Sequence, residues 1–167
     1  VIGILLNSAN ASNVENYANP AGPVQNAAKS LGLSLRVFQV ATLAEIQSAI
    51  DAAADQGIRP IMIAADALFT QYRENIGERA LARRIALSGA FKENTQAGAL
   101  TSYGPNYLDT FRLLGNQTAR VLQGQRPAEL PIMQPTKYEF VINLKTARAL
   151  GVAVPPMLLA LTDEVVE

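Results

Sequence analysis

The side chains able to do chemistry in this chain are carboxylates, amides, hydroxyls, lysines and phenols, because histidine and cysteine are both absent. This composition excludes disulfides, thiolate metal sites, and Ser-His or Cys-His catalytic pairs. It also removes the side chain that most readily transfers protons near neutral pH. An enzyme would have to rely on carboxylates or lysine, and we expect no catalytic residue and no metal ligand.

One carboxylate, Asp66, directly follows the apolar run Pro60 to Ala65. Its position resembles that of the phosphorylated aspartate of a response-regulator receiver, but that chemistry needs further acids after the first strand to hold Mg²⁺. The first strand ends instead in Leu6-Asn7-Ser8. Asp66 is therefore a candidate ligand-binding residue, and the alternative is that it only caps the next helix.

The loop after the first strand is dense in neutral hydrogen-bonding groups, namely Asn7, Ser8, Asn10, Ser12 and Asn13. Such residues commonly supply turns and helix caps, which is the structural alternative. Because this loop and Asp66 both follow strands, we expect them at one edge of one sheet. Asn7 and Ser8 are accordingly candidate ligand-binding residues, suited to holding a small polar molecule.

The segment Thr101-Ser102-Tyr103-Gly104-Pro105-Asn106 combines hydroxyls, a ring, a glycine and a proline. We interpret it as a strand-to-helix turn in which Asn106 caps the following helix. Ser102 and Tyr103 are candidate ligand contacts there, and Tyr103 or Phe69 would provide a ring for stacking. The alternative for Tyr103 is a half-buried packing role.

No phosphate-binding motif follows the first strand, where the nearest glycine is Gly22. Neither Gly-x-Gly-x-x-Gly nor a P-loop is present, so we expect no nucleotide cofactor. The acidic pair Asp163-Glu164 is adjacent in sequence, and neighbouring side chains point in different directions in helices and strands. We therefore predict a solvated chain end there rather than an acid-base site.

The composition is that of one ordinary domain: 167 residues, 49% hydrophobic, with 14 basic and 14 acidic side chains. This balance provides no field to attract nucleic acid or an anionic membrane, and we expect neither as a partner. No apolar run reaches the length of a membrane span. The opening run Val1 to Leu6 is typical of a core strand rather than a targeting segment, so we expect a chain trimmed from a longer protein.

Strands and helices are predicted to alternate along the chain. We expect strands at 1–6, 33–40, 60–65, 85–88, 97–101 and 138–142. We expect helices at 24–31, 43–56, 70–84 and 106–122, and a short one ending at Leu150. Thr42 and Glu45 have the spacing of a capping box. This order predicts an α/β fold, a three-layer sandwich with a mainly parallel sheet, whose ligands lie at the carboxyl ends of the strands.

The carboxyl-terminal part of the chain closely resembles a known family. The segment QPTKYEFVINLKTARALG, from Gln134 to Gly151, and the later PPMLLALTDEVVE resemble the end of bacterial ABC-transporter substrate-binding proteins of the tryptophan and tyrosine type. Members of that family have two lobes of the type I periplasmic-binding-protein fold, which close on a ligand. The resemblance implies that this chain is the carboxyl-terminal lobe of such a protein.

The resemblance also implies a function and a set of partners. We expect a periplasmic or extracytoplasmic solute-binding component of an ABC importer, with a small organic ligand, an aromatic amino acid being one candidate, and a membrane permease with its ATPase. Residues 101–134 would be a crossover segment whose apolar stripe packs on the missing lobe or on another copy, by self-association. The alternatives are a metabolite-sensing module of a regulator or receptor and a small carboxylate-dependent α/β enzyme.

Overall fold

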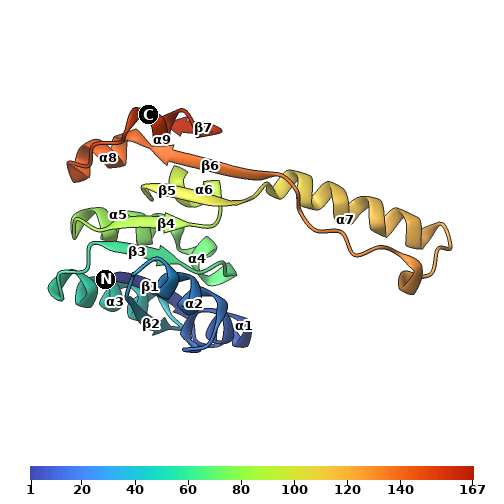
Figure 1. The fold of residues 1–167 in the computed structure, drawn as a ribbon, viewed down its shortest axis with the longest axis horizontal. Coiled ribbons are helices and arrows are strands. Elements are labelled where there is room, and N and C mark those ends of the chain that lie inside the picture. The colour runs from blue at the N-terminus through green and yellow to red at the C-terminus, as the bar shows by residue number, and fades with distance from the viewer.

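All 167 residues are described in a computed structural model of the chain. Seven strands form one sheet in the order β2-β1-β3-β4-β5-β6-β7. Every neighbouring pair is parallel except β5 and β6, which run antiparallel. The predicted α/β fold with a mainly parallel sheet is therefore confirmed (Figure 1).

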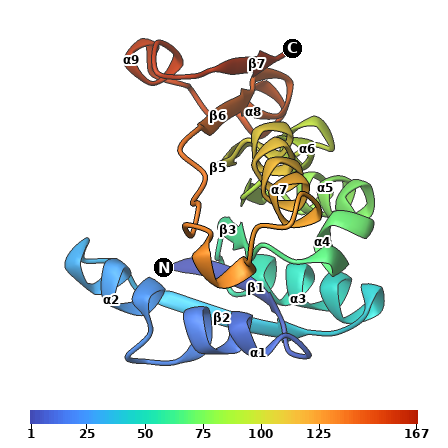
Figure 2. The ribbon, with the colours of Figure 1, turned by 90° about the vertical axis from the view of Figure 1, so that its right-hand side faces the viewer.

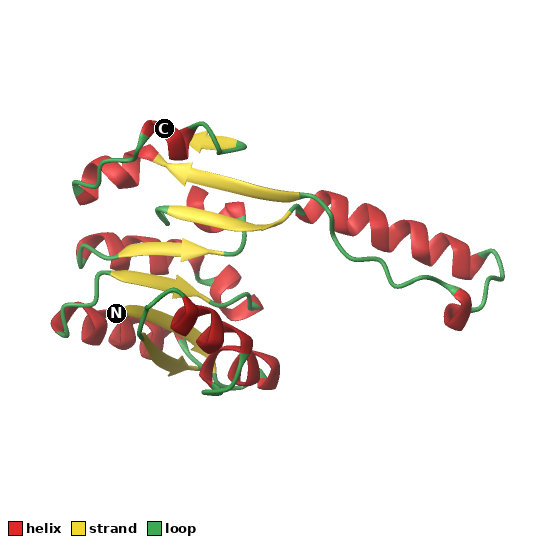
Figure 3. Cartoon of the chain, viewed as in Figure 1, coloured by secondary structure: helices red, strands yellow, loops and turns green.

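The elements follow one another in the predicted alternation (Figure 3). The strands are β1 Ile2–Asn7, β2 Leu35–Val40, β3 Pro60–Ile63, β4 Ala86–Gly89, β5 Thr101–Pro105, β6 Tyr138–Asn143 and β7 Glu164–Val166. The α-helices are α1 Ala11–Asn13, α2 Pro23–Ser30, α3 Leu43–Asp55, α4 Ala67–Gln71, α5 Arg73–Ala82, α6 Lys92–Gln96, α7 Tyr107–Leu122, α8 Leu144–Leu150 and α9 Pro156–Leu159. A π-helical turn, η1 Val14–Ala18, and a 3₁₀ turn, η2 Pro127–Glu129, complete the set.

Helices cover the two faces of the sheet unequally. Figure 2 shows α3, α4, α5 and α6 together on one side, whereas the other side has α2, next to β1 and β2, and the short α9 near β6. The main core lies under the fuller layer, where side chains such as Ile50, Phe69 and Leu87 are 2% exposed or less. The face beside α2 therefore has far less helical cover than the opposite face.

The start of α3 follows the predicted capping chemistry. The backbone N–H of Glu45 donates to Thr42 Oγ1 at 3.3 Å, and the Glu45 carboxylate accepts from the Thr42 N–H at 3.2 Å. These two bonds satisfy backbone donors that a helix start leaves without a partner. The capping box is confirmed, and it fixes where α3 begins after β2.

The prediction of a strand at 97–101 followed by a turn was wrong. The strand β5 is Thr101–Pro105 itself, and the helix α6 Lys92–Gln96 stands before it. Gly104 permits this strand to form, because a Cβ there would lie 1.9 Å from the backbone oxygen of Ala90. Only a glycine lets β5 pass so close to the loop after β4.

Asp163 is exposed and the Glu164 side chain is 42% exposed, as predicted for a solvated end, but the segment also belongs to the sheet. Glu164 begins β7, which pairs with β6 in parallel. The Asp163 carboxylate accepts from the N–H of Phe140 at 2.8 Å. Asp163 therefore satisfies a backbone donor of β6, and the carboxyl terminus forms the last strand of the sheet.

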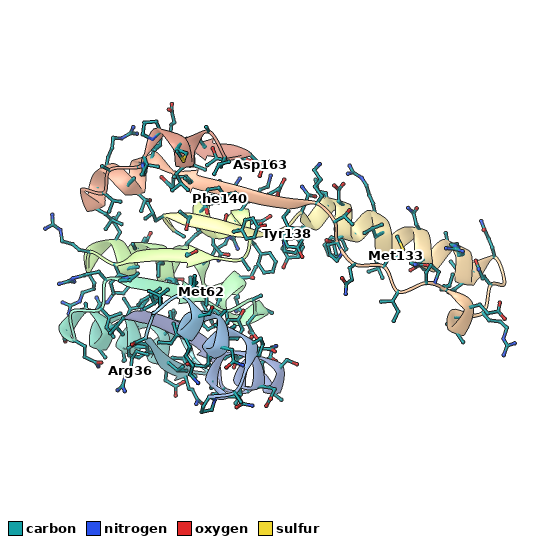
Figure 4. All side chains as sticks on the ribbon, in the orientation of Figure 1. Arg36, Met62, Met133, Tyr138, Phe140 and Asp163 are labelled. Carbon is teal, nitrogen blue, oxygen red and sulfur yellow. The ribbon has the colours of Figure 1, made fainter.

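After β5 the chain leaves the lobe as an arm, comprising α7 and the return segment 123–137 (Figure 1). None of the side chains of α7 is buried. Asn106 caps it as predicted, its Oδ1 accepting from the N–H of Asp109 at 2.8 Å. Figure 4 shows Met133 on the return segment beside the helix and Tyr138 where β6 re-enters the sheet. No helix of the structure, α7 included, has the length and hydropathy to cross a membrane.

The contrast between core and arm gives the first prediction. Replacing Phe69, which is 1% exposed, with alanine should lower the free energy of unfolding by about 3–5 kcal/mol, because it opens a cavity in the core. Replacing Ile132, which is 94% exposed on the arm, with alanine should change it by less than about 0.5 kcal/mol. Urea unfolding of both variants checks this, and equal losses would contradict the assignment of the core.

Candidate functional site

The carboxyl ends of β1, β3, β4 and β5 meet at one edge of the sheet, the edge from which α7 departs (Figure 1). Ligands of open parallel sheets lie at this edge because the loops that follow the strands converge there. We call it the carboxyl edge. It holds the loop after β1, the start of α4, and the loop between β4 and α6.

Three asparagines of the first loop converge on Asp66. Asn7 Nδ2 donates to Oδ1 of Asp66 at 3.0 Å, and Asn10 Nδ2 donates to Oδ2 at 2.7 Å. Asn13 Nδ2 adds a third bond, to Oδ2 at 3.0 Å. The N–H of Leu68 donates to Oδ1 at 2.9 Å, so Asp66 also caps α4. The cluster joins the loops after β1 and β3 into one unit, which we call the asparagine cluster.

The electrostatics of Asp66 follow from these contacts. Burial by itself raises the pKa of this carboxyl, but the hydrogen bonds from Asn10, Asn7, the Leu68 N–H and Asn13 together outweigh it. The pKa of Asp66 therefore lies below its ordinary value of 3.8. Both carboxylate oxygens are engaged by the protein, so the charge is held in place without a metal or a basic side chain.

Beside the asparagine cluster lies a shallow cleft of about 500 Å³. Its lining comes from three elements: Ala65, Asp66, Ala67, Thr70, Gln71 and Arg73 around α4, Phe91 before α6, and Tyr107 at the start of α7. The rings of Phe91 and Tyr107 stack with centroids 4.3 Å apart and planes 18° from parallel. One wall of the cleft is therefore aromatic, and the opposite wall is polar.

A second hollow of about 330 Å³ adjoins the first across the same two rings. It is lined by Glu93, Phe111 and Glu139 among others. Burial, and after it the negative charge of Glu93, raises the pKa of the Tyr107 phenol above its usual value. The phenol therefore stays protonated and can act as a hydrogen-bond donor at the rim of the cleft.

A larger hollow, about 630 Å³, lies elsewhere. It runs between α5, α6 and α8 and has no aromatic ring in its lining, which includes Glu74, Glu78 and Lys145. It is a charged surface groove of the helical layer. The aromatic wall and the convergence of loops favour the carboxyl edge as the binding site.

The structure places the sequence-predicted site residues in different environments. Asn7 and Asp66 lie together at the carboxyl edge, and Ser8 is held to β2 by its N–H, which donates to the Val40 oxygen at 3.0 Å. Phe69 is only 1% exposed and packs in the core, so its ring has no free face for stacking on a ligand. Phe69 lies within α4, three residues after Asp66, and anchors that helix to the core.

Ser102 and Tyr103 lie on opposite faces of β5. Ser102 is 1% exposed and its hydroxyl has no hydrogen-bond partner. Tyr103 is 64% exposed and stacks on Tyr138 of β6 with centroids 5.7 Å apart, on the α2 side of the sheet. The lobe therefore has two exposed ring clusters, one at Phe91 and Tyr107 and one at Tyr103 and Tyr138.

The sequence analysis missed Phe91, Arg73 and Tyr107 as cleft residues. Phe91 was missed because α6 was not predicted, so nothing marked it as the residue directly before a helix. A signal was present: Asn94, three residues on, accepts from the Phe91 N–H at 3.2 Å, as a residue near a helix start does. Tyr107 was assigned only to the apolar stripe of the arm.

No group of three or more acidic side chains lies close enough together to hold a metal ion. The charges of the carboxyl edge are instead single groups engaged by amides or by neighbouring charges. Arg73 donates to the Thr70 oxygen at 3.0 Å and lies 3.6 Å from the Glu74 carboxylate. What this arrangement can do is hold a small molecule by ring contact and hydrogen bonds.

The low pKa of Asp66 gives the second prediction. Because the pKa is lower in the folded lobe than in the unfolded chain, the stabilisation is present above about pH 4 and is lost as the pH falls through the folded pKa. Asp66→Asn should lower the free energy of unfolding by about 1–3 kcal/mol at pH 7, since charged hydrogen bonds are lost. The difference in unfolding free energy between Asp66→Asn and the wild type should become smaller at pH 3, as urea unfolding would show. A difference that does not change with pH would contradict a stabilising role for the ionised Asp66 carboxylate.

The fold is shared with solved structures of about twice this length. A conserved domain protein of Vibrio cholerae O1 biovar El Tor is 24% identical, with a TM-score of 0.88, over 98% of this chain and 54% of that one. An ABC domain from Streptococcus pneumonia, in complex with L-Trp, is 22% identical with a TM-score of 0.88, over 99% and 54%. A ligand-free, open substrate-binding protein with adhesive properties from Clostridium difficile is 20% identical with a TM-score of 0.69, over 99% and 54%.

The chain thus spans about half the length of the solved structures that it matches. No curated protein sequence matches it. The sequence profile of the family described as ABC transporter substrate binding protein matches residues 1–166, nearly the whole chain. The chain belongs to the ABC transporter substrate-binding protein family.

Proposed function

We propose that this chain is one lobe of the solute-binding component of an ABC importer. In this proposal the carboxyl edge is one jaw of a clamp, and a second lobe closes over it. The observation that carries the proposal is the ring-walled cleft beside the asparagine cluster, in a chain that belongs to this family. The proposed function is binding and closure rather than catalysis.

The lining of the cleft indicates the class of ligand. Phe91 and Tyr107 offer an aromatic wall to a flat apolar group, Arg73 lines the cleft with a positive charge, and Glu93 lines the adjoining hollow with a negative one. An aromatic amino acid carries a ring together with one charge of each sign. That the structural relative from Streptococcus pneumonia was solved with L-Trp supports the same ligand class.

The sequence-predicted residues have two roles in this proposal. Asn7 and Asp66 hold the loops of the carboxyl edge in one shape, so that the site is formed before ligand arrives. Ser8 and Tyr103 are exposed and would face the second lobe or the ligand. Ser102 and Phe69 lie below the surface and support β5 and α4.

The arm is the proposed connection to the second lobe. The matched solved structures hold nearly as much chain again as this one, and α7 extends from the carboxyl edge with no buried side chain. Residues 101–134 would cross to the second lobe and pack the apolar side of α7 on it. Closure would then bend the chain near Asn106 and Lys137, where the arm joins the sheet.

The proposal also covers partners and location. A solute-binding lobe of an importer works outside the cytoplasmic membrane, in a periplasmic or extracytoplasmic space, and delivers its ligand to a membrane permease coupled to an ATPase. The balanced charge of the chain gives no general attraction to an anionic membrane surface. Docking on the permease would therefore depend on shape and on individual side chains of the lobe.

Thermal unfolding in the presence of ligand tests the proposal. The chain contains no tryptophan, so it does not mask the fluorescence of a tryptophan ligand. In the two-lobe protein that contains this lobe, L-tryptophan, L-tyrosine and L-phenylalanine should raise the melting temperature, while the 167-residue lobe alone should show little or no shift. Binding of L-tryptophan to the lobe can be followed through the fluorescence of the ligand itself. If a panel of amino acids and small organic acids leaves the two-lobe protein unchanged, the proposal fails.

The two ring clusters give a third prediction, which locates the ligand. Tyr107→Ala should weaken binding of an aromatic ligand to the two-lobe protein by about 10-fold or more, because it removes half of the aromatic wall. Tyr103→Ala, the matched control at the other cluster, should have the smaller effect. Calorimetric titration of both variants checks this, and a larger loss at Tyr103 would move the site to the α2 side of β5.

A further inference from the structure

The hollow of about 330 Å³ behind the ring wall combines aromatic rings with two carboxylates, those of Glu93 and Glu139. We call it the acidic hollow. Its walls are the start of α6, the residue before that helix, and the base of the arm. The rings of Phe91 and Tyr107 line both the hollow and the cleft beside the asparagine cluster. A molecule that lies against the ring wall in the cleft can therefore extend a group into the acidic hollow.

A glycine brings Glu139 to this place. Glu139 follows Tyr138, which Figure 4 shows at the base of the arm, and pairs with Gly104 of β5. The backbone oxygen of Ala90 lies 1.9 Å from the position that a Cβ of Gly104 would take. The loop after β4 therefore passes close over the glycine, and Phe91, the next residue, lines the same hollow as Glu139.

Neither carboxylate of the hollow is neutralised by a basic side chain of the chain. No ion pair of the structure includes Glu93 or Glu139. Glu139 accepts a hydrogen bond from Asn106 Nδ2 at 2.5 Å, whereas the buried Oε2 of Glu93 has no hydrogen-bond partner. The ammonium group of Lys92 pairs with Glu164 of β7, at 3.6 Å. Because a carboxylate without donors is costly where water is excluded, the hollow favours a positively charged donor.

The rings of the hollow favour a cation as well. An aromatic face attracts a positive charge that lies within about 6 Å of the ring centroid. Tyr107 stacks on Phe91, and its centroid lies 6.0 Å from that of Phe111 in the first turns of α7. Burial, and after it the charge of Glu93, raises the pKa of the Tyr107 phenol, so the field of this carboxylate extends to the ring wall.

We infer that the acidic hollow is an ammonium subsite, which narrows the ligand of the proposed cleft to aromatic compounds that carry an amine. The inference rests on the proposed function, because it concerns the same site. The ring of the ligand lies against Phe91 and Tyr107, and its ammonium group enters the hollow. A primary ammonium has three N–H donors, and the carboxylates of Glu93 and Glu139 are its acceptors.

This subsite makes the amine of the ligand more important than its carboxylate. Arg73 lines the cleft but not the hollow, so a ligand carboxylate has its positive partner on the other side of the ring wall. An aromatic acid without an amine leaves Glu93 and Glu139 without a counter-charge and adds a further negative charge near them. Loss of the amine should therefore cost more affinity than loss of the carboxylate.

Three ligands that differ by one group test the subsite in the two-lobe protein. L-Phenylalanine has an ammonium and a carboxylate, phenethylamine has only the ammonium, and 3-phenylpropionate has only the carboxylate. Calorimetric titration should show 3-phenylpropionate binding about 10-fold or more weakly than either of the other two. A preference for 3-phenylpropionate over phenethylamine would overturn the inference and leave the proposed function standing. If no aromatic ligand binds, L-tryptophan included, the proposed function fails and the subsite fails with it.

Substitutions that keep the shape of the side chain locate the subsite. Glu93→Gln should weaken the binding of L-phenylalanine and phenethylamine by about 10-fold or more and leave 3-phenylpropionate unchanged or more tightly bound. Glu139→Gln, which keeps an oxygen for Asn106, should act in the same direction. Glu78→Gln, the matched control, removes a carboxylate of α5 that lies outside the hollow and should change none of the three affinities.

The pattern across the three ligands separates the subsite from a structural role. If Glu93 only supported the fold, or paired with a basic side chain of the second lobe, Glu93→Gln would weaken all three ligands alike. Equal losses, in a variant whose circular dichroism matches that of the wild type, would therefore overturn the inference.

Discussion

The antiparallel pairing of β5 with β6 is the constraint on which the rest of this structure depends. In a sheet built by right-handed crossovers, a helix between β5 and a parallel β6 would pack back on the face that α5 and α6 cover. Here the chain instead continues outward after Pro105 and returns at Tyr138, directly opposite in the pairing register. This exit of the chain leaves α7 without a buried side chain. It also explains why the arm can serve as a connection to a second body.

The asparagine cluster is the second organising feature, and it joins two loops that lie far apart in the sequence. A carboxylate at the edge of a sheet must be solvated or hydrogen-bonded. The three amides and one backbone N–H around Asp66 meet that need, and they tie the loop after β1 to the loop after β3. The aromatic wall at Phe91 and Tyr107 stands beside this fixed base. A shaped cleft on a rigid edge is what a binding jaw requires, because little order has to be gained when ligand arrives.

Much of the fold was predictable from the sequence because its signals are local. The capping pair Thr42 and Glu45, the cap at Asn106 and the apolar run after Pro60 each depend on residues within a few positions. The misplaced strand near Thr101 shows the limit. Its residues include Gly104 and Pro105, which normally indicate a turn, and only the close approach of Ala90 makes a glycine strand necessary there.

The site was predicted in part for the same reason. Asn7 and Asp66 could be grouped because parallel strands end at one edge, a rule that needs no coordinates. The burial of Phe69 and Ser102 could not be foreseen, since it depends on which face α4 and α6 present to the sheet. The joining of Phe91 to Tyr107 could not be foreseen either, because it depends on the exit direction of α7.

The claim that the arm leaves the lobe in a fixed outward direction is tested most directly by a distance between two spin labels. With cysteines placed at Lys29, near the end of α2, and at Gln123, at the tip of α7, and with unlabelled chain in excess, the distance is intramolecular. The account predicts about 40 Å, the sum of about 24 Å of helix and about 17 Å of sheet. A distribution centred below about 20 Å would show the arm lying on its own lobe and would contradict the account.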